Sequence, residues 1–308
     1  MSTIKNYLSL VKFSHTIFAL PFALIGFTLG LQYIVHTQKS VPHFSAMVGT
    51  FLLVLLCMLT ARSAAMAFNR FLDRHFDALN PRTAIREIPK GIIKAEKALL
   101  FVIANCIIFI VSTYFINTIC FYLSPVALFV ILFYSYTKRF TYLCHLVLGI
   151  GLSLAPIGAY LAVTGQFDIL PLLFSFAVLF WVSGFDIIYA LQDIDFDTTQ
   201  SLYSIPSHWG LRKALTIARV LHVFSAAFVI AAYFVGGFHF LYLVGVLVFV
   251  GMLIYQHSIV KPHDLSKVNI AFMTANGIAS IVFSIFVIAA IVLHLNAELV
   301  ATVTTLNA

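Results

Sequence analysis

Apolar residues run through this chain in long, nearly uninterrupted blocks, and polar residues gather in the stretches between them. Crossing a membrane core of ~30 Å takes about 20 helical residues. Nine blocks have that order of length, at residues 13–33, 46–68, 97–115, 118–137, 144–164, 169–191, 213–235, 238–256 and 269–294. The blocks lack the alternation of barrel strands, and only helices or closed barrels satisfy the backbone in lipid. The pattern therefore predicts an all-α fold, a polytopic membrane helix bundle with nine transmembrane helices.

The composition supports the same class of protein. Hydrophobic residues make up 62% of the chain, whereas soluble domains contain about 45–50% apolar residues. The chain has no low-complexity tract and no linker rich in serine or glycine, so we interpret residues 1–308 as a single membrane domain. The four cysteines stand singly in or beside apolar blocks, which favours packing positions over a metal site. The first apolar block is expected to be retained as a membrane helix, because no small-residue cleavage site follows it.

Basic residues lie almost entirely on one side of the predicted membrane. Of the 18 lysines and arginines, only Lys39 falls in a connection on the side opposite the N-terminus. The positive-inside rule therefore predicts a cytoplasmic N-terminus. Both long polar connections, residues 69–96 and 192–212, fall on that side, and long connections on one face tend to carry function. The formal net charge of +7 follows from this bias and from anionic lipid headgroups, so nucleic acid is not an expected partner.

Acidic residues recur at helical spacing near both long connections. Asn69, Asp73 and Asp77 follow one another at intervals of four, which places an amide and two carboxylates in a column on one helix face. A second column, with intervals of seven and four, consists of Asp186, Asp193 and Asp197. Charges kept this close to hydrocarbon indicate a function. Hard oxygen ligands grouped in this way are typical of Mg²⁺, which binds one or two carboxylates together with phosphate oxygens of a substrate.

Local ion pairs are the alternative to metal binding. Asp73 can pair with Arg70, and Asp77 with Arg74, within a solvated loop. The four-residue spacing in two segments on one side of the membrane favours a shared metal site over two unrelated sets of ion pairs. Asp195 points away from the second column and is expected to be solvated or to lie behind the ligands.

Cations between the acidic columns predict a diphosphate site. Arginine forks bind phosphate oxygens in pairs, and lysine acts on the same oxygens as a point charge. Arg82 and Arg86 follow the first acidic column, and Lys138 and Arg139 follow the fourth predicted helix. Tyr134 stands one helical turn before Lys138, so its hydroxyl can share an anion with that lysine. Anchoring of the helix at the membrane surface is the alternative role for Lys138 and Arg139.

Metal and phosphate ligands at the end of an aromatic-rich helix bundle favour a lipid-tailed allylic diphosphate as the substrate. Mg²⁺ would neutralise the charge that grows on the leaving diphosphate. Aromatic faces stabilise the remaining allylic cation by about 0.5–2 kcal/mol each, and the chain contains 31 Phe and 13 Tyr. Most of these rings are expected to serve packing, so no single ring is assigned this role.

These segments resemble the two aspartate-rich motifs of the UbiA superfamily of intramembrane prenyltransferases. The first motif is matched by NRFLDRHFD at residues 69–77, and the second by DIIYALQDIDFD at residues 186–197. Similarity extends from KFSHTIFALPF at residues 12–22 to Ser-Ile-Pro at residues 204–206. The resemblance therefore covers most of the chain, and a bundle of nine helices agrees with it.

The resemblance is strongest to the 4-hydroxybenzoate polyprenyltransferase branch, whose bacterial members carry the NPRTxxREIP pattern found at residues 80–89. It implies Mg²⁺-dependent transfer of a polyprenyl chain from polyprenyl diphosphate to the ring of 4-hydroxybenzoate, with release of diphosphate, in quinone biosynthesis. It also implies an integral protein of the bacterial inner (cytoplasmic) membrane, in contact with membrane lipid, whose active site opens toward the cytoplasm.

The resemblance implies a role for each matching residue. The metal ligands would be Asn69, Asp73, Asp77, Asp193 and Asp197. The diphosphate contacts would be Arg82, Arg86, Tyr134 and Lys138, with Arg139 beside them. Asp186 would lie near the aromatic acceptor, and Lys12 would hold the carboxylate of that acceptor.

Two positions depart from the family pattern. Arg70 stands where many members have aspartate, which removes one possible ligand. Ser201 stands where a glycine commonly follows the second motif, so the geometry of that loop is open. Neither change alters the expected chemistry.

The acceptor remains open between 4-hydroxybenzoate and a dihydroxynaphthoate, such as the 1,4-dihydroxy-6-naphthoate of menaquinone biosynthesis, because both are flat phenolic carboxylates. A membrane transporter of an anionic metabolite is the alternative from another class, but the charges concentrate at the cytoplasmic helix ends and not at mid-membrane. Donor chain length, oligomeric state and the roles of His15 and His75 are not decided by the sequence.

Overall fold

The computed structural model describes residues 3–11, 18–38 and 43–306. In these residues the fold is helical, with helices joined by short loops. The elements are α1 (Thr3–Leu10), α2 (Leu20–Gln38), α3 (Phe44–Leu72), α4 (Arg74–Leu79), α5 (Ala95–Ile116), α6 (Thr118–Thr137), α7 (Cys144–Thr164), α8 (Ile169–Ala190), the 3₁₀ turn η2 (Leu191–Asp193), α9 (Ile194–Thr199), α10 (Ile205–Gly236), α11 (Leu241–Ile259), the π-helix η3 (Ile270–Ala275) and α12 (Asn276–Leu306).

The prediction of nine membrane-spanning helices is confirmed. Among the described residues, nine helices are long and apolar enough to cross a membrane. The boundaries shift at the first span, where the described helix begins at Leu20 and residues 12–17 lie outside the described part of the chain. The seventh span also begins earlier than expected, at Ile205. The protein is thus an integral membrane protein of the all-α class, and the cytoplasmic position of its N-terminus stays a prediction.

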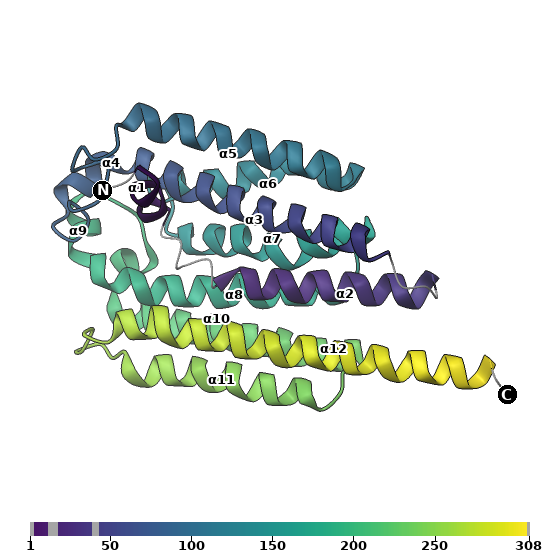
Figure 1. Ribbon diagram of the computed structural model, residues 1–308. Helices are drawn as coiled ribbons and strands as arrows, with labels where there is room; N and C mark the ends of the chain where they lie inside the picture. The colour runs from purple at the N-terminus through teal and green to yellow at the C-terminus, as the bar shows by residue number, and fades with distance from the viewer. Residues whose placement is uncertain (1–2, 12–17, 39–42, 307–308) are drawn as a thin grey trace.

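The long helices run side by side in an elongated bundle, and the short elements gather at one end (Figure 1). α4, α9 and the N-terminal α1 lie at that end, as does the loop that leaves α11, whereas the C-terminus lies at the other. α8 is the central helix, because it packs against α7 on one side and α10 on the other. α3 packs against α5, and α2 against α7. Both aspartate-rich segments therefore reach the same end of the bundle.

Aromatic side chains fill the core around α8. Trp181, Phe174 and Phe249 are fully buried, and the indole N–H of Trp181 donates to the Asn276 side-chain oxygen at 2.9 Å. In a soluble protein, burial of such a large apolar side chain would contribute roughly 1.5–3 kcal/mol to stability. In lipid, close packing and interhelical hydrogen bonds stabilise the helix bundle instead. The core holds α8 firmly, and α8 carries the second motif at its end.

The start of α10 is fixed by a capping box. The Ser204 hydroxyl accepts from the backbone N–H of Ser207, and the Ser207 hydroxyl accepts from the backbone N–H of Ser204. Gly210 then adopts φ of 74°, a conformation that glycine takes without steric cost, and it kinks the helix after its first turn. The segment Ser-Ile-Pro at residues 204–206 is thereby held against the second motif.

Candidate active site

The first motif keeps its helical column although α3 ends inside it. α3 ends at Leu72 and α4 begins at Arg74. The Asp73 backbone N–H donates to the Asn69 carbonyl at 2.9 Å, and the Asp77 N–H donates to the Asp73 carbonyl at 2.8 Å. The i to i−4 pattern therefore continues through the junction. The Asn69 amide also donates to the Asp73 carboxylate at 2.9 Å, so these two predicted ligands are in contact.

The second motif is divided by a 3₁₀ turn. Asp186 lies on α8, Asp193 ends η2 and Asp197 lies on α9. A 3₁₀ turn has 3.0 residues per turn and not 3.6, so the three residues of η2 add roughly 60° of rotation relative to an α-helix. Asp193 and Asp197 contact cations from other segments, whereas Asp186 contacts His145 of α7. Asp195 is exposed, as its spacing predicts.

Arg82 connects the two motifs. It follows the first motif in the chain, yet its guanidinium donates to both oxygens of Asp193, with Nε–Oδ1 of 3.1 Å and Nη2–Oδ2 of 2.5 Å. Its third nitrogen donates to the Tyr189 hydroxyl at 2.9 Å, and the Asn80 amide donates to Asp193 at 3.3 Å. Side chains of the segment after the first motif therefore bind the carboxylate of Asp193 in the second motif, as expected for two motifs that share one site.

Two adjacent cations at the end of α6 reach opposite motifs. Lys138 Nζ lies 2.6 Å from Asp197 Oδ1, and Arg139 Nη2 lies 2.8 Å from Asp73 Oδ1. Asp197 is fully buried and also accepts from the Ser204 hydroxyl at 3.1 Å. Burial opposes the charged ammonium of Lys138, but the combined effect of the bonded Asp197 and the nearby Asp193 outweighs it and raises the pKa of Lys138. Carboxylates of both motifs are thus within reach of one pair of cations.

Asp77 lies deepest in the first motif. It is buried, Arg86 Nη1 lies 2.5 Å from its Oδ1, and Arg70 Nη1 lies 3.9 Å from its Oδ2. Burial raises the pKa of Asp77 to about 6, although Arg70 opposes the shift. Burial likewise raises the pKa of Asp73, against the effect of Arg139. Both carboxyl groups therefore have less positive charge around them than a buried carboxylate requires.

The ion pairs differ from the local pairs considered as an alternative. Arg70 lies beside Asp77 and not beside Asp73, and Arg74 donates to the Phe71 carbonyl at 2.7 Å. The ion-pair partner of Asp73 is Arg139, which follows α6. These long-range partners assemble the cluster in the tertiary structure.

The donor set suits a magnesium ion shared with a substrate. Within the described parts of the chain, no three carboxylate, imidazole or thiol side chains form a ready-made metal site. Mg²⁺ does not need one, because it usually takes one or two carboxylates and completes its shell with phosphate oxygens and water. In addition, Oδ2 of Asp77 is buried and has no hydrogen-bond partner among the described residues. A buried carboxylate oxygen without a hydrogen-bond donor is therefore present on the motif predicted to bind metal.

Other predicted residues are placed as follows. Tyr134 lies close enough to Asp186 and Asp73 to interact with both electrostatically. Lys12 lies outside the described residues, as does His15. His75 is exposed.

Sequence reasoning missed one feature of the site and left another open. The sequence assigned no role to His145, yet its Nδ1 lies 2.6 Å from Asp186 Oδ2. Its position at the start of a span, on the same side as both motifs, was the available signal. Ser201 adopts φ of 53°, the one left-handed residue other than glycine in the described chain. The loop thus keeps the conformation for which a glycine is favoured.

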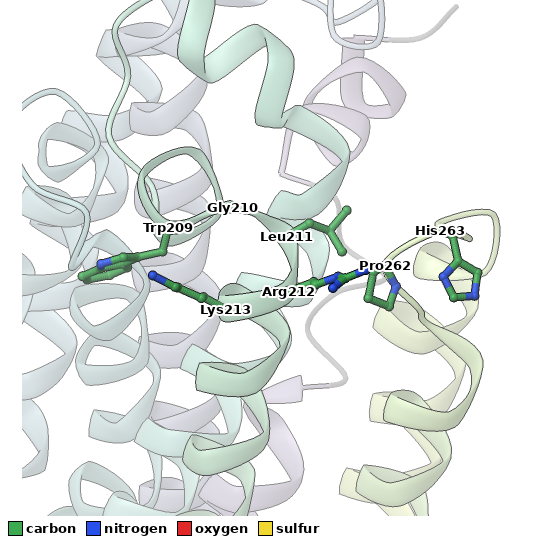
Figure 2. Close-up of a pocket in the computed structure, with 7 residues that line it drawn as sticks. All are labelled: Trp209, Gly210, Leu211, Arg212, Lys213, Pro262 and His263. Atoms are coloured by element: carbon green, nitrogen blue, oxygen red, sulfur yellow. The ribbon is translucent and has the colours of Figure 1, made fainter.

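A separate pocket of about 480 Å³ lies beside the kink of α10, lined by Trp209, Gly210, Leu211, Arg212, Lys213, Pro262 and His263. Figure 2 shows Arg212 extending toward Pro262, with Trp209 and Lys213 on the other side of the kink. No residue that lines this pocket has a predicted catalytic or binding role.

Comparisons with known proteins agree with this architecture. The profile of the UbiA prenyltransferase family matches residues 19–278. A 4-hydroxybenzoate octaprenyltransferase of Tolumonas auensis is 34% identical over 181 residues, which are 59% of this chain and 62% of that protein. The octaprenyltransferase of the same name from Actinobacillus pleuropneumoniae is 35% identical over 143 residues, 46% of this chain and 48% of that protein. The matched region thus spans about half to three fifths of these relatives.

Solved structures share the fold over almost the whole chain. An apo UbiA homologue from Aeropyrum pernix K1 has a TM-score of 0.74 and 29% identity, and the match covers 91% of this chain and 98% of that one. A UbiA homologue from Archaeoglobus fulgidus bound to DMAPP and Mg²⁺ has a TM-score of 0.68 and 19% identity, with 93% and 99% covered. At that identity the second likeness shows the fold alone.

In the described part of the chain, nine apolar helices with two aspartate motifs joined by cations at one end define a class of intramembrane protein with a charged site beside the membrane surface. Within that class, the chain belongs to the UbiA prenyltransferase family.

Proposed function

We propose that the protein transfers a polyprenyl group from polyprenyl diphosphate to the ring of 4-hydroxybenzoate, with Mg²⁺, in quinone biosynthesis. The observation that carries the proposal is the network in which Arg82, Lys138 and Arg139 join the two aspartate motifs. Guanidinium and ammonium groups are the side chains that bind diphosphate, and they lie here on the carboxylates that suit Mg²⁺. The curated relatives named 4-hydroxybenzoate octaprenyltransferase support the choice of reaction.

Binding of the donor would exchange the partners of these ion pairs. Asp73, Asp193 and Asp197 would turn from cations to Mg²⁺, together with Asn69 and Asp77. The released cations would turn to the diphosphate oxygens, joined by Arg86 and Tyr134. Because each buried charge keeps a partner of opposite sign, the exchange avoids the cost of leaving a charge unpaired near hydrocarbon.

The bound metal supplies positive charge that stabilises the leaving diphosphate. The residues of the chain bind the donor, orient its allylic carbon toward the bundle and keep water away from it. Arg82 is well suited to orientation, because its planar fork already holds Asp193 at two atoms and Tyr189 at a third. Asp186 lies apart from these ion pairs and is assigned to the aromatic acceptor, whose carboxylate Lys12 would hold.

The site is proposed to open toward the cytoplasm across the bacterial inner membrane. The site lies at the bundle end that carries α4, α9 and the N-terminal α1 (Figure 1). The basic residues of the connections on that side far outnumber those on the other, which is the charge bias of cytoplasmic loops. Soluble acceptor and released diphosphate would then enter and leave on that side.

The test uses purified protein in lipid discs with a polyprenyl diphosphate, Mg²⁺ and one phenolic acid. 4-Hydroxybenzoate and 1,4-dihydroxy-6-naphthoate are supplied in parallel, and products are identified by mass. Prenylated benzoate with an equal amount of diphosphate, lost when EDTA is added, supports the proposal. Prenylated naphthoate alone would move the protein to menaquinone biosynthesis. No product and no diphosphate from either acid would overturn the proposed reaction.

A further inference from the structure

Asp186 differs from the other four predicted aspartates in its partner. Those four each lie beside a lysine or arginine, whereas in the described chain no lysine or arginine nitrogen lies within 4.0 Å of Asp186. Its partner is His145, whose Nδ1 lies 2.6 Å from Asp186 Oδ2. A guanidinium or ammonium keeps a carboxylate ionised, whereas an imidazole next to a carboxylate can take part in moving a proton. Asp186 is thus the aspartate of the site that suits proton transfer.

The contacts of His145 define which ring nitrogen carries its proton. The backbone N–H of Ile205 donates to His145 Nε2 at 3.3 Å. A nitrogen that accepts a hydrogen bond carries no proton, so the proton of the neutral ring lies on Nδ1 and is donated to Asp186. The Ile205 N–H is the first of α10 and is held in place by the capping box at Ser204. The imidazole is therefore fixed at both nitrogens.

Close packing of α7 and α8 fixes the ring further. One turn after His145, a Cβ added to Gly149 would lie 2.4 Å from Ser183 Oγ and 2.5 Å from the Leu179 carbonyl oxygen, so only glycine permits this approach of the two helices. The Ser183 hydroxyl lies between the two helices, 2.7 Å from the Leu179 carbonyl oxygen of α8 and 3.1 Å from the His145 carbonyl oxygen of α7. The His145 side chain is 3% exposed and that of Asp186 is 19% exposed. The imidazole of the pair is therefore buried, whereas part of the Asp186 carboxylate is accessible.

We propose that His145 is a positioning residue that holds Asp186 as the acceptor of the proton that the aromatic substrate loses, an inference that rests on the function proposed above. In that reaction the bond between the allylic carbon and the diphosphate oxygen breaks, and its electron pair leaves with diphosphate. A ring carbon of the acceptor forms the new carbon–carbon bond. The hydrogen on that ring carbon leaves as a proton to the free edge of Asp186, and its bonding pair restores the aromatic ring. Asp186 then returns the proton to solvent.

Nδ1–H of His145 contributes by occupying one oxygen of Asp186 and leaving the other free for the substrate. This arrangement resembles the orientation of a catalytic group by a hydrogen-bonded neighbour, whose loss commonly lowers activity about 10- to 100-fold.

Two conservative variants separate the contacts of His145. In His145→Asn the amide nitrogen occupies nearly the place of Nδ1 and can still donate to Asp186. In His145→Gln the amide oxygen occupies nearly the place of Nε2 and can still accept from Ile205, while the bond to Asp186 is lost. We expect kcat of His145→Asn to stay within about threefold of the wild type and kcat of His145→Gln to fall roughly 10- to 100-fold. KM for the diphosphate donor should be unchanged in both.

A control variant measures the effect that loss of a buried histidine has on activity when that histidine has no contact with Asp186. His222 is 3% exposed, its Nδ1 lies 2.9 Å from His257 Nε2 on α11, and its Nε2 lies 3.3 Å from the Trp181 carbonyl oxygen, so its two ring nitrogens contact groups other than carboxylates. His222→Gln is expected to leave the ratio of kcat to donor KM near that of the wild type. A purely structural role for His145 predicts equal losses in the Asn and Gln variants, and that result overturns the inference.

A spectroscopic measurement tests the hydrogen bond between His145 and Asp186 without an activity assay. In protein labelled with ¹⁵N-histidine, His145 should show the Nδ1-protonated neutral ring, and its Nδ1 signal should shift in Asp186→Asn. A ring protonated at Nε2, or an unchanged Nδ1 signal, overturns the inference whatever the acceptor is. Wild-type protein that makes no product with any phenolic acid overturns the proposed function and this inference together. Active wild-type protein with equal Asn and Gln variants overturns the inference alone.

Discussion

Replacement of Arg82 by lysine tests whether the guanidinium fork organises the donor site. In the structure the fork donates to both oxygens of Asp193 and to Tyr189, and in the proposed complex it turns to diphosphate. Lysine keeps the positive charge and loses the paired geometry. A hydrogen bond to a charged group contributes roughly 1.5–3 kcal/mol. Because the Arg82 side chain is 34% exposed, solvent screening reduces the expected loss to about 1–2 kcal/mol.

At 1.4 kcal/mol for each factor of ten, this loss corresponds to a roughly 5- to 30-fold weaker affinity for the diphosphate donor. The assay is a titration with a non-hydrolysable donor analogue in Mg²⁺, with donor KM as the kinetic counterpart. Acceptor KM and melting temperature should stay close to the wild type. Arg212→Lys, at the pocket away from the aspartates, is the matched control. Unchanged donor affinity in Arg82→Lys, or the same loss in both variants, would refute the reasoning.

Three further predictions concern the acidic residues and the loop after them. Asp193→Asn should lower turnover at least about 100-fold while membrane insertion stays normal. Asp195→Asn changes an exposed side chain and should have an activity close to that of the wild type. Comparable activities of the two variants in the product assay would contradict the predicted metal role of Asp193. Ser201→Gly should stabilise the protein by about 0.5–1 kcal/mol. A left-handed residue with a Cβ costs roughly 1–2 kcal/mol, and the greater entropy of glycine in the unfolded chain offsets part of the gain from removing that Cβ. A lower melting temperature of the variant in thermal unfolding would contradict this prediction. The Mg²⁺ concentration for half-maximal rate should rise as the pH falls through about 6, because the pKa of Asp77 is raised to about 6 and a proton then competes with Mg²⁺ for its carboxylate. A Mg²⁺ requirement that is constant from pH 7.5 to 5.5 would show that Asp77 does not bind the metal.

The membrane fold was largely predictable because it depends on local hydrophobicity. A helix in lipid must bond its own backbone, so the length and spacing of apolar blocks suffice to count spans, as the nine helices among the described residues confirm. Helix ends were less predictable. α10 begins at Ile205, several residues before its apolar block, because the capping box at Ser204 starts a helix in a polar sequence.

The four-residue column of Asn69, Asp73 and Asp77 was also predictable, because it depends on backbone geometry within one segment and survives the junction between α3 and α4. The partners of the second column were not, since Asp186 contacts His145 and Asp193 contacts Arg82, with the 3₁₀ turn η2 between them. Nothing in the spacing of the aspartates marks that turn.

The sequence by itself determined the membrane class, the number of spans and the residue types that cluster at one end, because each follows from hydrophobicity and periodicity along the chain. Only the tertiary structure decided which charges meet. Arg82 reaches Asp193 from a separate loop, and His145 reaches Asp186 because Gly149 lets α7 and α8 approach closely. Such contacts depend on how helices pack against one another, and packing is set by the shapes of many distant side chains at once and not by the spacing of residues within one segment.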